Sequence, residues 1–139
     1  MTRLLYSLAI TALISGCATV PYTEKVLAEG GTVIKGDFAD LVGESGTTAI
    51  SVNGDWWGFY GPGGRKVIHV APLNETAELS WRVNESGEFC EIEFRSREEK
   101  CFGEEYQLIK TKDGLYSRTK NGKKGEYPFR IEEGNTKNL

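Results

Sequence analysis

Hydrophobic and polar residues alternate with a period of two through most of the chain after Gly30-Gly31. Successive side chains of a β-strand point to opposite faces of the sheet, so this period predicts strands. No stretch of this region carries a sustained apolar stripe with a period of 3.6, which disfavours parallel sheets joined by crossover helices. The candidate strands are Thr32–Lys35, Thr47–Val52, Asp55–Tyr60, Lys66–Ala71, Glu78–Val83, Glu88–Arg95, Tyr106–Thr111, Leu115–Thr119 and Tyr127–Glu132.

Turn signals between these strands organise them into hairpins. Asn53-Gly54, Asp113-Gly114 and Asn121-Gly122 supply the positive φ that tight hairpins require, and Gly61-Pro62-Gly63-Gly64 cannot continue a strand. Short antiparallel strands must close into a barrel or fold over to hide their edges. We therefore predict an all-β fold over residues 30–135, with a tail at 136–139: a small antiparallel β-barrel, or a strongly curved sheet or sandwich, of eight or nine short strands.

The first residues of the chain have the pattern of an export signal. Arg3 provides a positive charge, Leu4 to Ile14 form an apolar stretch, and the small residues Ser15 and Gly16 follow it. A transmembrane helix needs about 20 apolar residues, so this stretch is too short to span a bilayer. Residues 1–16 are predicted to be a cleaved signal peptide.

The block Ile14-Ser15-Gly16-Cys17 resembles the lipobox of bacterial lipoproteins. The resemblance implies cleavage before Cys17, transfer of a diacylglycerol to its sulfur and acylation of the new amino group, with chains such as palmitate. We expect residues 17–29 to be a lipidated N-terminus and tether. Ala18 stands where the common inner-membrane retention signal has Asp, which favours an outer-membrane anchor facing the periplasm. An ordinary secretory signal with a chance Cys is the alternative.

The cysteine count agrees with export. Once Cys17 is assigned to lipid, Cys90 and Cys101 remain as a possible pair. In an oxidising compartment a disulfide between them would close a loop of about 12 residues, worth about 3 kcal/mol in the chain-entropy model. A redox-active or metal-binding pair is the alternative, but the spacing is not that of a C-x-x-C motif and no His lies nearby.

The disulfide also tests the register of the strands. In Glu88–Arg95 strict alternation puts Cys90 on one face with Ile92 and Phe94, and we expect this face to point inward. A bulge at Gly103 would bring Cys101 into phase with the next apolar strand.

An aromatic strand carries the candidate binding residues. Trp56 and Trp57 are adjacent and face opposite sides, so one indole should be partly exposed. Tyr60 lies on the side of Trp56, and Phe59 lies on the side of Trp57. An exposed aromatic pair would suit a sugar ring or an apolar ligand. In the alternative interpretation one face is core and the other is covered by the tether or a loop.

The charged residues exclude several functions. The formal net charge of the 139-residue chain is −3, which does not favour nucleic acid as a partner, and its single His makes a metal or cofactor site hard to assemble. That residue, His69, alternates with apolar neighbours and is expected to face solvent. The acidic pairs Glu98-Glu99 and Glu104-Glu105 are expected to be solvated charges. One basic patch is predicted around the Asn121-Gly122 turn, formed by Arg118, Lys120, Lys123 and Lys124.

A family resemblance covers residues 30–135. It rests on the aromatic strand and Gly-rich turn from Trp57 to Gly64, on Leu79-Ser80-Trp81-Arg82-Val83, on the two downstream cysteines and on Ile131-Glu132-Glu133-Gly134-Asn135. Together these segments resemble the domain-of-unknown-function family numbered 995, which are small exported bacterial proteins. The resemblance implies an exported β-rich fold and supplies no catalytic residues.

These patterns favour a non-catalytic outer-membrane lipoprotein whose periplasmic β-domain binds an envelope component, such as a glycan or lipid, or a partner protein. An alternative is a lipid-anchored inhibitor of a hydrolase such as lysozyme or a protease. An inhibitor would need an exposed loop, and Leu73–Ala77 and the Cys90–Cys101 loop are the candidates. No catalytic triad or carboxylate pair stands out in the sequence, so we do not expect an enzyme.

Overall fold

A computed structural model describes residues 20–125 and 128–139. The predicted signal peptide and Cys17 lie outside these residues. The helical elements are α1 (Tyr22–Ala28), α2 (Phe38–Leu41) and the 3₁₀ turn η1 (Ala71–Leu73). The strands are β1 (Thr32–Ile34), β2 (Thr47–Ser51), β3 (Trp56–Tyr60), β4 (Arg65–Val70), β5 (Glu75–Val83), β6 (Phe89–Ile92), β7 (Glu99–Phe102), β8 (Tyr106–Lys110), β9 (Tyr116–Lys120), β10 (Lys123–Lys124) and β11 (Phe129–Glu133).

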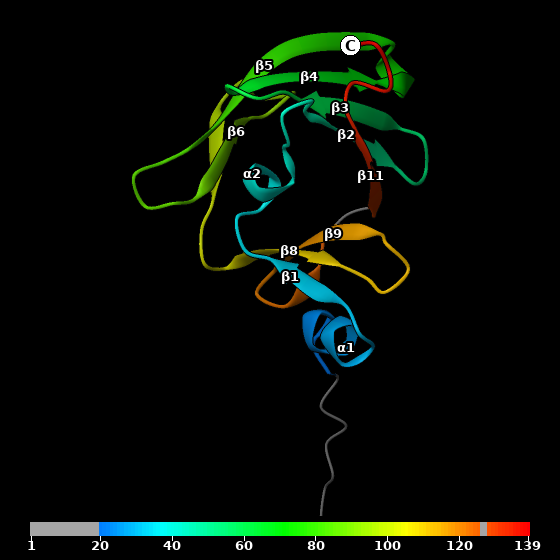
Figure 1. The fold of residues 1–139 in the computed structure, drawn as a ribbon, viewed down its shortest axis with the longest axis vertical. Coiled ribbons are helices and arrows are strands. Elements are labelled where there is room, and N and C mark those ends of the chain that lie inside the picture. The colour runs from blue at the N-terminus through cyan, green and yellow to red at the C-terminus, as the bar shows by residue number, and fades with distance from the viewer. Residues whose placement is uncertain (1–19, 126–127) are drawn as a thin grey trace, which may run out of the picture.

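All strands belong to one curled antiparallel sheet. Its order is β1-β8-β9-β11-β2-β3-β4-β5-β6-β7, and β10 pairs with β9 beside this path. The path starts at β1 and ends at β7, so the sheet forms an open half-barrel around a hollow (Figure 1). The prediction of an all-β, strongly curved antiparallel sheet is confirmed. Each of the nine predicted strands is present, and the short β7 and β10 are additional.

The predicted hairpin turns are formed by residues with left-handed backbone conformations. Gly54, Gly114 and Gly122 have φ values of 78°, 85° and 75°. Asn121, before Gly122, also has a positive φ of 50°. These values match the requirement of tight hairpin turns, so the local sequence accounts for the register of the hairpins.

The predicted inward facing of Cys90 in β6 is wrong, although Phe94, which was predicted to share its face and follows β6, does line the concave cavity. Phe89 belongs to the hydrophobic core, and Glu91 bonds to side chains on the concave side, so these two residues rather than Cys90 carry the inward face. Cys90 is fully buried all the same, because it pairs with Cys101 on the neighbouring β7. Alternation identified which residues share a face, but both faces of this segment carry apolar residues, so it could not identify the inner one.

The predicted bulge at Gly103 is also wrong. The chain makes a tight turn there, with the amide of Tyr106 donating to the carbonyl of Gly103 at 3.0 Å. This turn separates β7 from β8, so no continuous strand needs an inserted residue to change its phase. Phe102 instead of Cys101 packs against the core that Leu108 belongs to.

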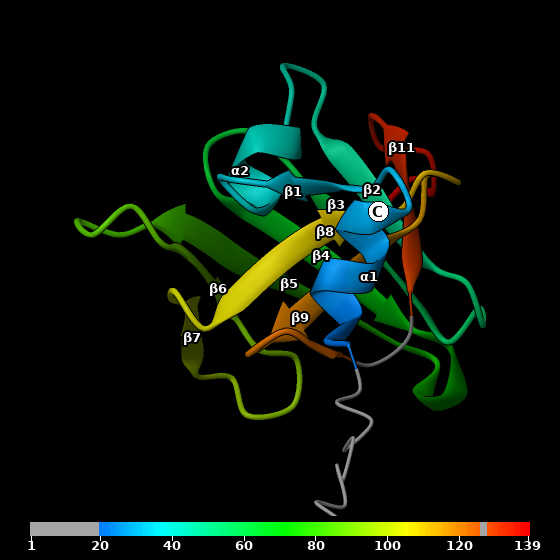
Figure 2. The same cartoon turned by 90° about the horizontal axis from the view of Figure 1, so that it is seen from below.

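Both ends of the described chain pack onto the sheet. Thr23 and Val26 of α1 are buried, and the Thr23 hydroxyl donates to Thr119 Oγ1 of β9 at 3.1 Å. The α1 helix packs on β1, β8 and β10, and Figure 2 shows it lying over β8. At the other end the amide of Thr136 donates to Thr48 Oγ1 of β2. Part of the segment expected to be a tether, and part of the expected tail, therefore belong to the folded body.

The core lies in the hollow of the half-barrel, where α2 is inserted (Figure 1). Phe38 of α2 stacks on Tyr60 with ring centroids 4.3 Å apart and on Phe129 at 5.5 Å. The side chain of Asp37 caps α2 by accepting from the amide of Phe38. Burial of several aromatic rings contributes a large part of the stability of such a small domain. The α2 helix therefore fills one part of the hollow and defines the floor of what remains.

Candidate functional site

A cavity of about 680 Å³ occupies the remaining concave side of the sheet. Its size falls within the usual range for small-molecule pockets of roughly 300 to 1,000 Å³. Buried side chains such as Lys66 form its floor, whereas exposed ones such as Leu73 mark its mouth. The lining residues are Phe38, Asp55, Trp56, Tyr60, Lys66, Ile68, Val70, Pro72, Leu73, Glu91, Glu93, Phe94, Arg95, Arg118 and Phe129.

A buried ion pair lies on the floor of this cavity. Lys66 Nζ is 3.0 Å from Glu91 Oε2, and their side chains are only 4% and 13% exposed. Lys66 also donates to the carbonyl of Ile92 at 3.0 Å. Tyr60 donates its hydroxyl to the same Glu91 oxygen at 3.0 Å. Burial, followed by the negative charge of Glu91, raises the pKa of Tyr60 well above its ordinary value, so the phenol stays protonated as the donor.

Arg118 extends this ion pair into a cluster of four charges. Its Nε lies 3.3 Å from Asp37 Oδ2, and its Nη2 bonds to Asp37 Oδ1. Its Nη1 is 4.0 Å from Glu91 Oε1. Its guanidinium carbon lies 3.5 Å from the centre of the Phe102 ring. Burial by itself lowers the pKa of Arg118, but the carboxylates of Asp37 and Glu91 outweigh that effect and raise it, so the guanidinium stays charged.

We name Asp37, Lys66, Glu91 and Arg118 the charge cluster. It holds two positive and two negative side chains, which neutralise one another where a single charge would be costly to bury. Four elements bring these residues together: the start of α2 and strands β4, β6 and β9. The arrangement can hold a polar group at the bottom of a cavity whose walls combine apolar side chains with Asp55, Glu93 and Arg95.

The structure divides the predicted aromatic residues between two sides of the sheet. Trp56 and Tyr60 line the cavity, in agreement with the prediction that they share a face. Trp57 lies on the outer face, where it stacks on His69 with centroids 4.5 Å apart and where Lys137 Nζ lies 5.6 Å from its ring. Phe59 is buried on that outer face. Of the candidate binding residues, Trp56 and Tyr60 are thus in the cavity and Trp57 is not.

Sequence reasoning missed the charge cluster. Arg118 was expected in a surface patch with Lys120, Lys123 and Lys124, but it points into the hollow and is only 19% exposed. Lys66 is predicted only as the first residue of the strand Lys66–Ala71. A signal existed for Lys66, since it is in phase with Ile68 and Val70 on β4 and therefore shares their inward face.

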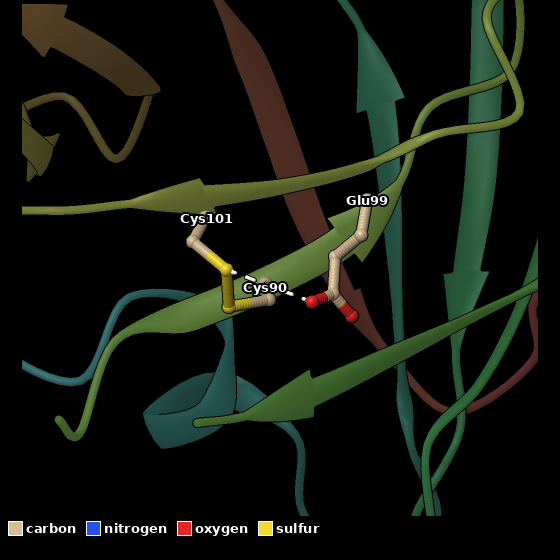
Figure 3. Close-up of side chains that lie close together, drawn as sticks. All are labelled: Cys90, Glu99 and Cys101. Atoms are coloured by element: carbon tan, nitrogen blue, oxygen red, sulfur yellow. Dashed lines mark hydrogen bonds between the residues drawn. A yellow bond between two sulfur atoms is a disulfide. The ribbon is translucent and has the colours of Figure 1, made fainter. Parts of the chain in front are cut away.

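The disulfide between Cys90 and Cys101 is present, which confirms that prediction. Figure 3 shows Glu99 beside it, with Cys101 Sγ 3.9 Å from Glu99 Oε1. These three side chains are close enough to hold a metal ion only if both thiols were free. The two sulfurs are bonded to each other, and Glu99 is held by Arg82 at 2.6 Å, which also lowers the Glu99 pKa. This group is therefore structural.

The two loops considered for inhibition are small. Residues 75–77 of the first candidate, Leu73–Ala77, form the start of β5, so that only Leu73 and Asn74 project. Leu73 is 56% exposed at the mouth of the cavity. In the Cys90–Cys101 loop, residues 93–98 connect β6 to β7, and Phe94 turns into the cavity lining.

No family of known proteins, curated protein or solved structure matches this chain. The resemblances to bacterial lipoproteins and to the family numbered 995 therefore stay predictions. Within residues 20–125 and 128–139, none of the helices is long and apolar enough to cross a membrane.

Proposed function

We propose that the chain is an exported bacterial lipoprotein, anchored through Cys17 in the outer membrane, whose periplasmic half-barrel binds a component of the cell envelope in its cavity without catalysing a reaction. The observation that carries this proposal is the cavity of about 680 Å³, which combines apolar walls with a charged floor. Apolar surface with a few converging polar groups is typical of small-molecule binding sites.

The side chains of the cavity support binding over catalysis. Among the residues that the structure describes, its lining contains no Ser, Thr, Cys or His, and the carboxylate of Glu91 is already held by Tyr60 and Lys66. The chain's single His stacks on Trp57 on the outer face. Lys66 is held in an ion pair with Glu91, and Arg118 is held in an ion pair with Asp37.

The position of α1 supports a β-domain held close to a membrane. Five residue steps separate Cys17 from Tyr22, where α1 begins, and a fully extended chain of that length spans at most about 18 Å. Because α1 is packed on β8, β10 and β1, the β-domain cannot move further from a lipid on Cys17 than this distance. A bilayer component would then be within reach of the domain.

Two measurements test the proposal. Mass spectrometry of the native protein should find a chain that begins at a lipidated Cys17. For the cavity, residues 18–139 are exported behind a cleavable secretory signal, purified and mixed with an envelope lipid extract. Native mass spectrometry should then find the protein with the mass of a bound ligand added. This form contains all the residues whose contacts are described above, 20–125 and 128–139.

A blocking variant shows where the ligand binds. Val70→Trp fills the cavity, and it should abolish the bound mass. Thr76→Trp places the same side chain at an exposed position on the neighbouring strand and should leave binding intact. Binding that survives Val70→Trp, or an unprocessed N-terminus, would contradict the proposal.

Inhibition of a hydrolase is the second candidate function. Leu73 projects at the mouth of the cavity, next to Asn74 in a left-handed conformation with φ of 47°, and could enter an active-site cleft. The same protein should then lower the activity of lysozyme or of a protease at equimolar concentration, and Leu73→Asp should remove the effect. Undiminished hydrolase activity would contradict inhibition, and ligand binding would remain as the proposed function.

A further inference from the structure

We infer that the ligand of this cavity is an uncharged amphiphile whose hydroxyl or primary amide group binds between Glu91 and Arg118. The inference rests on the proposed binding function and adds the chemical class of the ligand. It comes from two polar atoms of the charge cluster that face each other across the cavity floor without a hydrogen bond.

The two atoms are Glu91 Oε1 and Arg118 Nη1. Glu91 Oε2 is occupied, since it accepts from Tyr60 and pairs with Lys66, both at 3.0 Å. Arg118 uses its Nε and Nη2 on Asp37. The remaining atoms, Oε1 and Nη1, are 4.0 Å apart, and neither forms a hydrogen bond with another residue in the described part of the chain.

This separation fits one inserted polar group. A distance of 4.0 Å is too long for a direct hydrogen bond, which spans about 2.7 to 3.2 Å between nitrogen and oxygen. A hydroxyl group can accept from Nη1 and donate to Oε1 at once, because it has both a proton and lone pairs. A primary amide can do the same with its oxygen and its NH₂ group. The site therefore fits a ligand head group that carries a hydrogen-bond donor and a hydrogen-bond acceptor side by side.

The charge cluster disfavours an ionised head group. Its two cations and two anions already neutralise one another in a buried position. A carboxylate or phosphate placed there would meet the two cations only while lying beside Glu91, and an ammonium would likewise lie beside Arg118. At this position either ion would lose its hydration without gaining an unpaired counter-charge from the charge cluster, which is unfavourable. A neutral head avoids this cost.

Apolar walls next to the cluster suit the rest of such a molecule. Trp56, Ile68, Val70 and Phe129 line the same cavity as the two open polar atoms. The body of an amphiphile would bury apolar surface there at about 25 cal/mol for each Å² removed from water. The indole of Trp56 would also lose contact with water, so its fluorescence reports on occupancy.

A matched series of probes tests the inference. The ligands 1-monolauroylglycerol, laurate and dodecyltrimethylammonium carry similar chains with a neutral, an anionic and a cationic head. Each should be titrated below its micelle concentration into residues 18–139, following tryptophan fluorescence. We expect the neutral probe to bind at least about tenfold more tightly than either ion, because only the ions leave an uncompensated charge in a buried site.

Two neighbouring tryptophans provide the internal control. Trp57→Phe removes an indole on the outer face and should keep the signal, whereas Trp56→Phe should remove most of it. Equal or tighter binding of laurate or dodecyltrimethylammonium would overturn the inference but leave a ligand-binding cavity in place. Binding of none of the three would overturn the inference and the proposed function together.

Discussion

Removing the buried lysine of the charge cluster is expected to destabilise the domain strongly. Lys66 and Glu91 are 3.0 Å apart, with side chains 4% and 13% exposed. Lys66→Met keeps the length and apolar stem of the side chain but leaves Glu91 without its nearest cation. Loss of one partner of a buried ion pair costs about 3 to 5 kcal/mol, because the remaining charge is desolvated and uncompensated.

The preceding residue on β4 offers a matched control. Arg65 pairs with Glu78 at 3.2 Å on the outer face, where the side chains are 44% and 69% exposed. Exposed pairs contribute no more than about 1 kcal/mol, because water screens the charges and holding two long side chains costs entropy. Arg65→Met should therefore change the free energy of unfolding by less than about 1 kcal/mol.

Urea unfolding of the oxidised protein measures both effects. A further variant, Lys66→Met combined with Glu91→Gln, removes both charges while the amide still accepts from Tyr60. The free energy of unfolding of this double variant should be about 1 to 3 kcal/mol higher than the separate effects of Lys66→Met and Glu91→Gln add up to. If Lys66→Met costs no more than Arg65→Met, or if the single effects simply add, the buried pair is not coupled and the reasoning fails.

Three further predictions concern the disulfide, a buried phenol and a glycine turn. Reduction, or Cys90→Ser with Cys101→Ser, should lower the free energy of unfolding by about 3 kcal/mol, seen as a lower urea midpoint; an unchanged midpoint would refute this. The pKa of Tyr60 is raised in the folded state, so the unfolded state loses the phenol proton at a lower pH. The free energy of unfolding should therefore fall as pH rises above about 10. The phenolate absorbance of Tyr60 should appear only when the protein unfolds. Gly63→Ala and Gly64→Ala both place a side chain at positive φ, but only the second puts Cβ 2.6 Å from a backbone carbonyl oxygen, so it should cost clearly more than the roughly 1 kcal/mol of the first; equal midpoints would contradict this.

The position of the strands could be predicted because it depends on neighbouring residues. Alternation over five or six residues and signals such as Asn53-Gly54 act within one hairpin, and the strands and turns of the structure follow them. The pairing of Cys90 with Cys101 could also be predicted, since it followed from counting the cysteines. Trp56 and Tyr60 share a face as expected, because alternation fixes facing within a strand.

The candidate site could be predicted only in part. The facing of β6 was reversed, because Phe89 on one side and Cys90 with Ile92 on the other are equally plausible core faces. Arg118 was predicted to lie on the surface because several lysines are close to it in the sequence. Its actual partner, Asp37, is 81 residues away and belongs to the cap of α2. Local patterns carry no information on such a contact.

The sequence by itself determined that this chain forms short antiparallel strands joined by Gly-containing hairpins and clasped by one disulfide. Those features depend on backbone preferences and spacing within a few residues. Only the tertiary structure decided where the sheet curls, that α2 enters its hollow, and that charges from α2, β4, β6 and β9 meet at the floor of a cavity. Their meeting depends on the burial of distant side chains against one another, because charges are stable there only when they are paired.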